Sequence, residues 1–226
     1  HAQWIRPDNA AIFVVGDTSL RDIVRLLNRS FGDWRAAPGV TRGTKDFSIA
    51  IPTPQPRILF VDRPNSPQST IIAAEVLSVR GRDNPVVLRA ANDVLGGNFL
   101  SRINLNLREA KGWTYGASSW IGTQEDRVTF GIAAPVQADR TGDAIRDIRN
   151  DVHNFLNGEG VTPAELQRTV NGSIRELPGQ FETAPAVLGA IERIVQLDRP
   201  DDYYVRLADR YRAMTAAGLD ATAKAA

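Results

Sequence analysis

A stretch rich in proline and glycine divides this chain of 226 residues. Between positions 36 and 56 the sequence carries Pro38, Gly39, Gly43, Pro52, Pro54 and Pro56. Proline fixes one backbone angle and lacks the N–H that helices and central strands use, so this stretch predicts a linker or an extended strap. We therefore expect three parts: an N-terminal piece over residues 1–40, a Pro-rich linker over residues 41–56, and a larger domain over residues 57–226.

The N-terminal piece is predicted to contain one strand and one helix. Residues 11–15 form a short apolar run rich in β-branched side chains, which is typical of a buried strand. Residues 16–19 break that run and offer side chains that cap helices. From Leu20 to Phe31 the apolar residues fall on one helical face, and Gly32 follows as a stop.

The larger domain is predicted to begin with strands and to end with helices. We expect strands at residues 58–61, 69–79, 113–121 and 128–136, the last two joined as a hairpin. We expect helices at residues 85–95, 100–111, 139–156, 162–177, 183–197 and 201–214, and from 215 onward. Because strands precede a run of helices, the sequence predicts an α+β fold, with a mixed or antiparallel β-sheet and helices packed on one face.

The composition excludes several classes of partner and chemistry. With 27 basic and 26 acidic side chains, a net charge of +1 and no long run of one sign, neither nucleic acid nor a membrane surface is an expected partner. No apolar run approaches the roughly 20 residues of a membrane-spanning helix. The chain has no cysteine, which excludes disulfides, thiolate metal sites and cysteine nucleophiles.

A zinc site is not expected in this chain. A zinc hydrolase needs at least three protein ligands and an open position, whereas the sequence has only the histidines His1 and His153. His153 lies in a predicted helix with no second histidine at helical spacing, so we interpret it as a surface or structural residue. The prediction is no metal and no cofactor in this chain.

Two motifs lie close together in the larger domain. Residues 95–102 read L-G-G-N-F-L-S-R, and residues 107–116 read L-R-E-A-K-G-W-T-Y-G. Together they resemble the non-catalytic C-terminal domain of the insulinase/pitrilysin zinc metallopeptidases, and the resemblance extends over most of residues 57–226. One departure is Trp113, which stands where a smaller or aliphatic residue is common in that family.

The resemblance implies a role as one half of a protease. In that family the metal, the water and the general base belong to the other half, on an inverted H-x-x-E-H helix that this chain lacks. It implies zinc in a partner domain of the same protein or in a partner subunit, and a peptide or unfolded protein as substrate. This chain would close the peptide-binding chamber and would be inactive alone.

Arg108 and Tyr115 are the candidate catalytic residues, in an auxiliary role. The resemblance implies that both reach across a cleft to bind the substrate and the transition state. Peptide hydrolysis passes through an oxyanion, and a charged guanidinium fork and a phenol O–H are suitable donors. We expect Tyr115 to open a strand after a sharp turn at Gly112. From the pair alone, a surface arginine and a half-buried strand tyrosine remain the alternative.

The turn formed by Gly96, Gly97 and Asn98 is a candidate substrate-binding segment. The resemblance implies it, because in that family this glycine-rich turn lies near the cleft. The alternative is structural, since two glycines after an apolar helical stripe are also typical of a helix C-cap.

The order of the segments suggests a displaced strand. Residues 6–17 read R-P-D-N-A-A-I-F-V-V-G-D and match the element that ends each half in that family, yet they stand first here. We hypothesise that residues 1–40 are the tail of a preceding, zinc-type domain. Residues 11–15 would then supply a strand to the sheet of residues 57–226, within one chain or by strand exchange in a homodimer. Finding residues 11–15 outside the sheet would contradict this hypothesis.

Two other functions and the compartment stay open. The chain could be a catalytically dead structural or scaffold subunit of the same family, although a scaffold has no need of the pair Arg108 and Tyr115. It could also be a peptide-binding module without catalysis. The lack of cysteine and the resemblance favour the bacterial periplasm or envelope, without establishing either.

Overall fold

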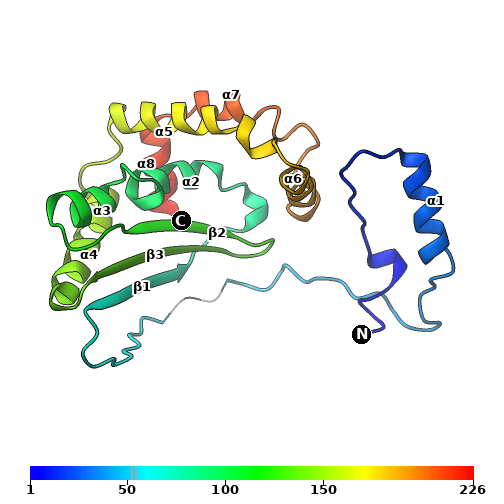
Figure 1. Cartoon of the computed structure of the whole chain (residues 1–226), viewed down its shortest axis with the longest axis horizontal. Coiled ribbons are helices and arrows are strands. Elements are labelled where there is room, and N and C mark those ends of the chain that lie inside the picture. Colours follow the sequence, from blue (N-terminus) through cyan, green and yellow to red (C-terminus); the bar gives the residue numbers. More distant parts are fainter. Residues whose placement is uncertain (52, 54) are drawn as a thin grey trace. The chain divides into compact units, whose positions relative to one another are not determined.

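The computed structural model describes residues 1–51, 53 and 55–226. These residues form two compact units (Figure 1): a smaller unit of residues 1–50 and 178–196, and a larger unit of residues 51–177 and 197–226. The division into residues 1–40, 41–56 and 57–226 stays a prediction. Its linker includes Pro52 and Pro54, which lie outside the described residues.

The smaller unit is helical where it has regular structure. It contains η1 (Pro7–Asn9), α1 (Leu20–Phe31), η6 (Pro178–Phe181) and α6 (Ala184–Gln196). Helix α1 has the bounds expected from the sequence, because both of its ends are capped locally. The Ser19 hydroxyl accepts a hydrogen bond from the Asp22 N–H at 3.2 Å, and the Gly32 N–H donates to the Asn28 carbonyl at 2.9 Å.

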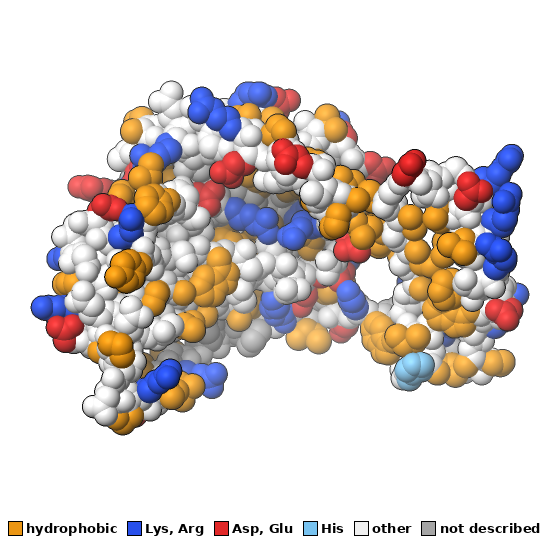
Figure 2. Space-filling view, viewed as in Figure 1, with side chains coloured by type: hydrophobic (Ala, Val, Ile, Leu, Met, Phe, Trp, Pro, Cys, Tyr) orange, Lys and Arg blue, Asp and Glu red, His pale blue; other side chains and the backbone are white. Residues whose placement is uncertain are grey.

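The strand expected at residues 11–15 does not form. These residues are not part of the sheet, so the expectation that they complete the sheet of their own chain is wrong. A strand needs a neighbouring strand to accept its backbone hydrogen bonds, and an apolar pattern alone does not supply one. Ile12 and Val14 remain 53% and 47% exposed. Hydrophobic side chains accordingly gather on the visible face of the smaller unit (Figure 2).

The larger unit is built on an antiparallel sheet. Within the described residues the sheet has three strands, β1 (Gln68–Val76), β2 (Ser118–Thr123) and β3 (Val128–Gln137), in the order β1-β3-β2. The predicted hairpin of β2 and β3 is confirmed, with Ser118 opposite Ala133 and Thr123 opposite Val128.

The prediction of a strand at residues 58–61 is also wrong. These four apolar residues are extended but unpaired, and their exposed fractions range from 79% at Val61 to 97% at Ile58. Strand β1 follows them after a turn and lies at the edge of the sheet, so one side of its backbone carries no neighbouring strand among the described residues.

Helices cover one face of this sheet (Figure 1). They are η2 (Gly81–Asp83), α2 (Val86–Asn92), the π-helix η3 (Asp93–Gly97), α3 (Arg102–Asn104), the π-helix η4 (Leu105–Ala110), η5 (Ala138–Arg140), α4 (Thr141–Asn157), α5 (Pro163–Glu176), α7 (Leu207–Arg212) and α8 (Ala216–Ala225). The α+β prediction is confirmed. In the described part of the chain, no helix combines the length and the apolar composition needed to cross a membrane.

The main core lies between the sheet and these helices. From β3, the inward side chains Ile132, Ala134 and Val136 pack in the same cluster as Ile103 and Leu107, which are fully buried. On the open face, Trp120 lies over Gly131, where an added Cβ would stand 2.2 Å from the indole ring. The alternation of inward and outward residues along β3 is what a sheet with one covered face requires.

An ion pair connects α3 to the start of α5. The Arg102 guanidinium donates to both carboxylate oxygens of Glu165, at 2.8 and 2.7 Å. Glu165 also accepts from the Thr162 N–H at 2.8 Å, which completes the capping box suggested by the sequence. Burial alone would raise the pKa of Glu165, but the hydrogen bonds from Arg102 and Thr162 outweigh it and lower the pKa to about 2.

Candidate functional site

Arg108 lies near the end of η4 and is held against an aromatic ring. Its side chain is 32% exposed and forms an ion pair with the neighbouring carboxylate of Glu109. The guanidinium carbon stands 4.4 Å from the ring centroid of Phe99, which is within the range of a cation–π contact. The guanidinium is therefore positioned by Phe99 and still reaches the surface.

Tyr115 lies in the connection between η4 and β2. The chain turns at Gly112, whose φ of +65° suits glycine, as expected. The expectation that Tyr115 opens a strand is wrong, because β2 begins at Ser118. The Thr114 hydroxyl accepts from the Gly116 N–H at 3.0 Å, which is turn geometry rather than a strand. The Tyr115 side chain is 91% exposed.

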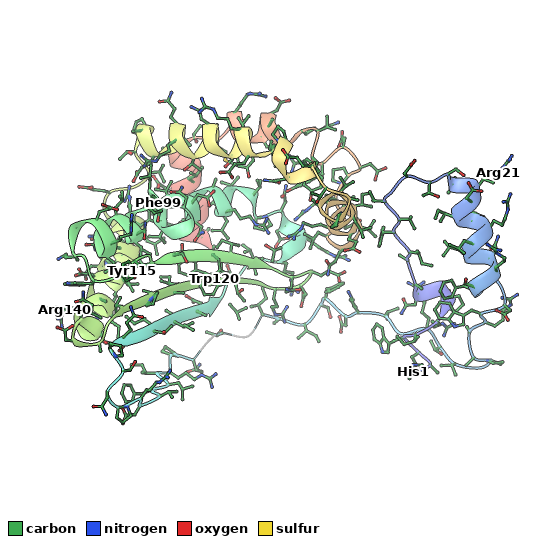
Figure 3. All side chains as sticks on the ribbon, viewed as in Figure 1. His1, Arg21, Phe99, Tyr115, Trp120 and Arg140 are labelled. Atoms are coloured by element: carbon green, nitrogen blue, oxygen red, sulfur yellow. The ribbon has the colours of Figure 1, made fainter. Side chains whose placement is uncertain are left out.

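A buried amide joins the two connections that carry Phe99 and Tyr115. The Asn104 side chain, in a residue that is 3% exposed, donates to the Phe99 carbonyl at 2.7 Å. Its oxygen accepts from the Ala117 N–H at 3.0 Å. Figure 3 shows Phe99 and Tyr115 extending from these neighbouring connections. Arg108, Phe99 and Tyr115 thus belong to one local structure centred on Asn104.

Neither Phe99 nor Asn104 was among the site residues predicted from the sequence. Asn104 adjoins the apolar positions Ile103 and Leu107 of the same helix, and a polar residue beside a buried stripe is a signal for a structural hydrogen bond. Phe99 gives no such signal, because an apolar residue after a turn is usually interpreted as a residue that packs in the core.

The glycine turn has close neighbours of its own. A Cβ on Gly96 would stand 2.4 Å from the Ser119 hydroxyl oxygen, and one on Gly97 would stand 2.5 Å from Oδ1 of Asp93. Both glycines therefore allow close packing, and both lie inside η3 rather than at the helix C-cap expected in the structural alternative, because the C-cap is Asn98. Asn98 is exposed, and its side-chain oxygen accepts from the Leu100 N–H at 2.9 Å.

The chemistry available here is hydrogen-bond donation. Arg108 offers charged N–H groups and Tyr115 offers one O–H group. In the described residues, no group of three His, Cys, Asp or Glu side chains could hold a metal ion, and His153 is exposed on α4. The site can thus hold an anionic or carbonyl oxygen.

Comparison with known proteins gives the family. The family model described as peptidase M16 inactive domain matches residues 1–173. A search of curated proteins found no match.

Three solved structures of related fold are about twice as long as this chain. A peptidase M16 inactive domain from Pseudomonas fluorescens is 22% identical with a TM-score of 0.76, over 93% of this chain and 48% of that chain. A protease from Helicobacter pylori is 19% identical with a TM-score of 0.76, over 99% and 54%. A predicted insulinase family protease from Yersinia pestis is 15% identical with a TM-score of 0.68, over 99% and 50%.

These similarities agree with the resemblance found in the two motifs at residues 95–102 and 107–116. The chain spans about half the length of these solved structures. Because the family model covers more than half of the chain, this protein belongs to the family of peptidase M16 inactive domains.

Proposed function

We propose that this chain is the metal-free half of a zinc metalloendopeptidase and contributes Arg108 and Tyr115 to substrate and transition-state binding. The observation that supports this best is the placement of Arg108. Its guanidinium is held 4.4 Å from the Phe99 ring centroid while a third of its side chain stays exposed. An arginine that is positioned by a ring and still reaches the surface can donate to a substrate oxygen.

The two side chains have complementary roles in this proposal. A guanidinium carries a permanent charge and can bind an oxyanion or a substrate carboxylate through two parallel N–H bonds. The Tyr115 phenol would donate to the same oxygen or to a neighbouring substrate carbonyl. Zinc, the attacking water and the general base would come from a second half that carries H-x-x-E-H. That half would be a domain of the same protein or a partner subunit.

The test is peptide cleavage by this chain together with a zinc-binding half. Losing one oxyanion donor typically lowers kcat by roughly 10²–10³, so Arg108→Ala should lower kcat by about a hundredfold with zinc content unchanged. Tyr115→Phe removes only the O–H group. Arg146→Ala is the matched control, because Arg146 is exposed and pairs only with Asp143 on its own helix.

The outcomes separate the candidate functions. A rise in KM alone for Arg108→Ala would make Arg108 a substrate-binding residue rather than a transition-state residue. Equal activity of Arg108→Ala and Arg146→Ala would refute the proposal and favour a structural or scaffold subunit. Peptide affinity of this chain alone, without cleavage in the assembled enzyme, would favour a peptide-binding module.

Asn98 and the two glycines before it would line the substrate path. In support, Asn98 and Gly97 are exposed and directly precede Phe99, the residue that contacts Arg108. The substrate would be a peptide or an unfolded protein segment. Asn98→Ala should raise KM and leave kcat unchanged, and an unchanged KM would remove Asn98 from the site.

The strand of residues 11–15 does not form within one chain, so of the two routes only exchange between copies remains, and we propose a homodimer formed in this way. Residues 11–15 and residues 58–61 are both apolar and extended, and neither forms part of a sheet in a single copy. Pairing residues 11–15 of one copy with residues 58–61 of another would satisfy both backbones. Light scattering should give twice the monomer mass, and Val14→Lys should restore the monomer. A monomeric wild type at high concentration would refute this.

A further inference from the structure

Two arginines lie against one tyrosine ring in the larger unit. The guanidinium carbons of Arg199 and Arg210 stand 5.6 and 5.1 Å from the ring centroid of Tyr203. Arg210 belongs to α7, and Arg199 and Tyr203 precede that helix in the chain. Burial, together with the positive charges of Arg210 and Arg89, lowers the pKa of Arg199. Like charges are therefore gathered at a partly buried place.

Hydrogen bonds hold this arrangement in position. Nη1 of Arg199 donates to the Arg82 carbonyl at 2.8 Å, and its Nη2 donates to the carbonyl of Gly81. The Tyr203 hydroxyl donates to Oδ1 of Asn84 at 3.0 Å. Carbonyl groups satisfy N–H donors but leave the positive charge without a counter-charge.

Arg199 and Arg210 lack an anionic partner in the described part of the chain. Neither forms an ion pair with a carboxylate within 4.0 Å there. Moreover, Nη1 of Arg210 is buried and has no hydrogen-bond partner. Arg102 offers the contrast, since it is similarly buried but is paired with Glu165. A buried unpaired charge is costly, and natural proteins pair such charges with an anion or a ligand.

Nearby carboxylates form no ion pair with Arg199 or Arg210 in the described residues, although the charge of Asp83 opposes the lowering of the Arg199 pKa. Asp83 caps η2 by accepting from the Arg80 N–H at 2.7 Å. Burial and the charge of Glu176 raise the pKa of Asp93 to about 6, although Arg89 opposes the rise. Asp93 therefore carries a negative charge less readily than an ordinary carboxyl, and Glu176 forms no ion pair within 4.0 Å in the described residues.

We propose that Arg199 and Arg210, beside Tyr203, form a binding site for an oxyanion, either a carboxylate or a phosphate group. A guanidinium presents a planar fork of N–H donors that matches the oxygens of both groups. The unpartnered Nη1 of Arg210 would donate to the ligand, and the charge of Arg199 would add to the attraction. Arg89, which donates to the Thr123 hydroxyl at 2.6 Å, would strengthen the local positive field.

Titration calorimetry on the full chain tests this site with two probes. One is sodium phosphate, and the other is N-acetylalanine, a molecule whose only charged group is a carboxylate. Sodium chloride holds the ionic strength constant, so that charge screening is the same in every titration and any difference in heat reports specific binding. We expect saturable binding of at least one probe with a Kd below about 10 mM. Stronger binding of phosphate would identify a phosphate ligand, and stronger binding of N-acetylalanine would identify a peptide carboxylate.

Variants assign the binding to these arginines. Hydrogen bonds to charged groups are worth about 1.5–3 kcal/mol, so Arg210→Gln should weaken the Kd at least about tenfold. Arg199→Gln removes only a nearby charge and should weaken the Kd by a smaller factor. Arg206→Gln is the matched control, because Arg206 is exposed and pairs with Asp202. Arg210→Lys keeps the charge but not the fork, and should bind more weakly than the wild type.

Thermal unfolding provides a second readout that a purely structural role would not give. Phosphate should raise the Tm of the wild type but not that of Arg210→Gln. Without an added anion, Arg210→Gln should not lower the Tm, since it removes an unpaired buried charge. No saturable binding of either probe, or equal weakening by Arg206→Gln, would overturn the proposal. These measurements need no zinc-binding half, so they stand apart from the proposed protease function.

Discussion

The ion pair between Arg102 and Glu165 should make an unusually large contribution to stability, and Glu165→Gln measures it. The pair is bidentate, with side chains that are 21% and 15% exposed. A fall in the pKa of Glu165 from 4.5 to about 2 corresponds to an upper bound of about 3 kcal/mol. Because solvent still reaches the pair, screening reduces this, and we expect a loss of about 1–2 kcal/mol at pH 7.

The pH dependence gives the sign of this effect. The pKa of Glu165 is lower in the folded than in the unfolded chain, so its stabilisation is present above pH 4.5 and is lost as the pH falls toward about 2. The difference in unfolding free energy between the wild type and Glu165→Gln should therefore shrink to less than half between pH 7 and pH 3.

Urea unfolding at the two pH values, followed by circular dichroism, measures both quantities. Asp143→Asn is the control, because the pair of Asp143 and Arg146 is 39% and 64% exposed, and such pairs contribute about 0–1 kcal/mol. If Glu165→Gln costs no more than Asp143→Asn at pH 7, or if its cost is the same at pH 3, the reasoning is refuted.

Three further predictions concern the site and its support. Phe99→Ala should lower kcat/KM of the assembled enzyme by about fivefold through loss of the contact with Arg108, which is worth about 1 kcal/mol. An unchanged kcat/KM would contradict that role. Gly96→Ala should destabilise the fold by about 1–3 kcal/mol, because its Cβ would stand 2.4 Å from the Ser119 hydroxyl oxygen; denaturant unfolding tests this against Gly172→Ala, a position with open space. Asp93→Asn should stabilise the fold by about 1–3 kcal/mol at pH 8 and by little at pH 4, because the raised pKa of about 6 means that the ionised carboxylate is disfavoured in the folded state. Equal effects at both pH values would contradict this.

The elements set by neighbouring residues were predictable from the sequence. Helix α1 has its expected bounds because Ser19 and Gly32 mark its ends. The hairpin of β2 and β3 and the start of α5 at Thr162 also follow from turn and cap residues. Cap and turn residues lie within a few positions of the element that they end, so these signals can be recognised in a single sequence.

The elements that depend on distant partners were not predictable. Residues 11–15 and 58–61 have good strand composition, but neither segment forms a strand in the described part of the chain. Strand composition alone does not indicate whether a pairing partner is present. For the site, the roles of Arg108 and Tyr115 stay predictions, whereas the sharp turn at Gly112 is confirmed. The contacts of Phe99 and Asn104 arise only when separate connections meet.

The π-helical turns η3 and η4 make the site sensitive to chain length. A π-helix accommodates one residue more than an α-helix in the same turn, and Arg108 lies within η4. Deleting a single residue such as Asn106 would let η4 relax into an ordinary α-turn. A π-turn takes up its extra residue while the helical segments on either side keep their register, so the deletion would displace Arg108 within η4 and change its contact with Phe99. Insertions and deletions between residues 93 and 110 are thus a route by which Arg108 could be moved without any substitution at position 108.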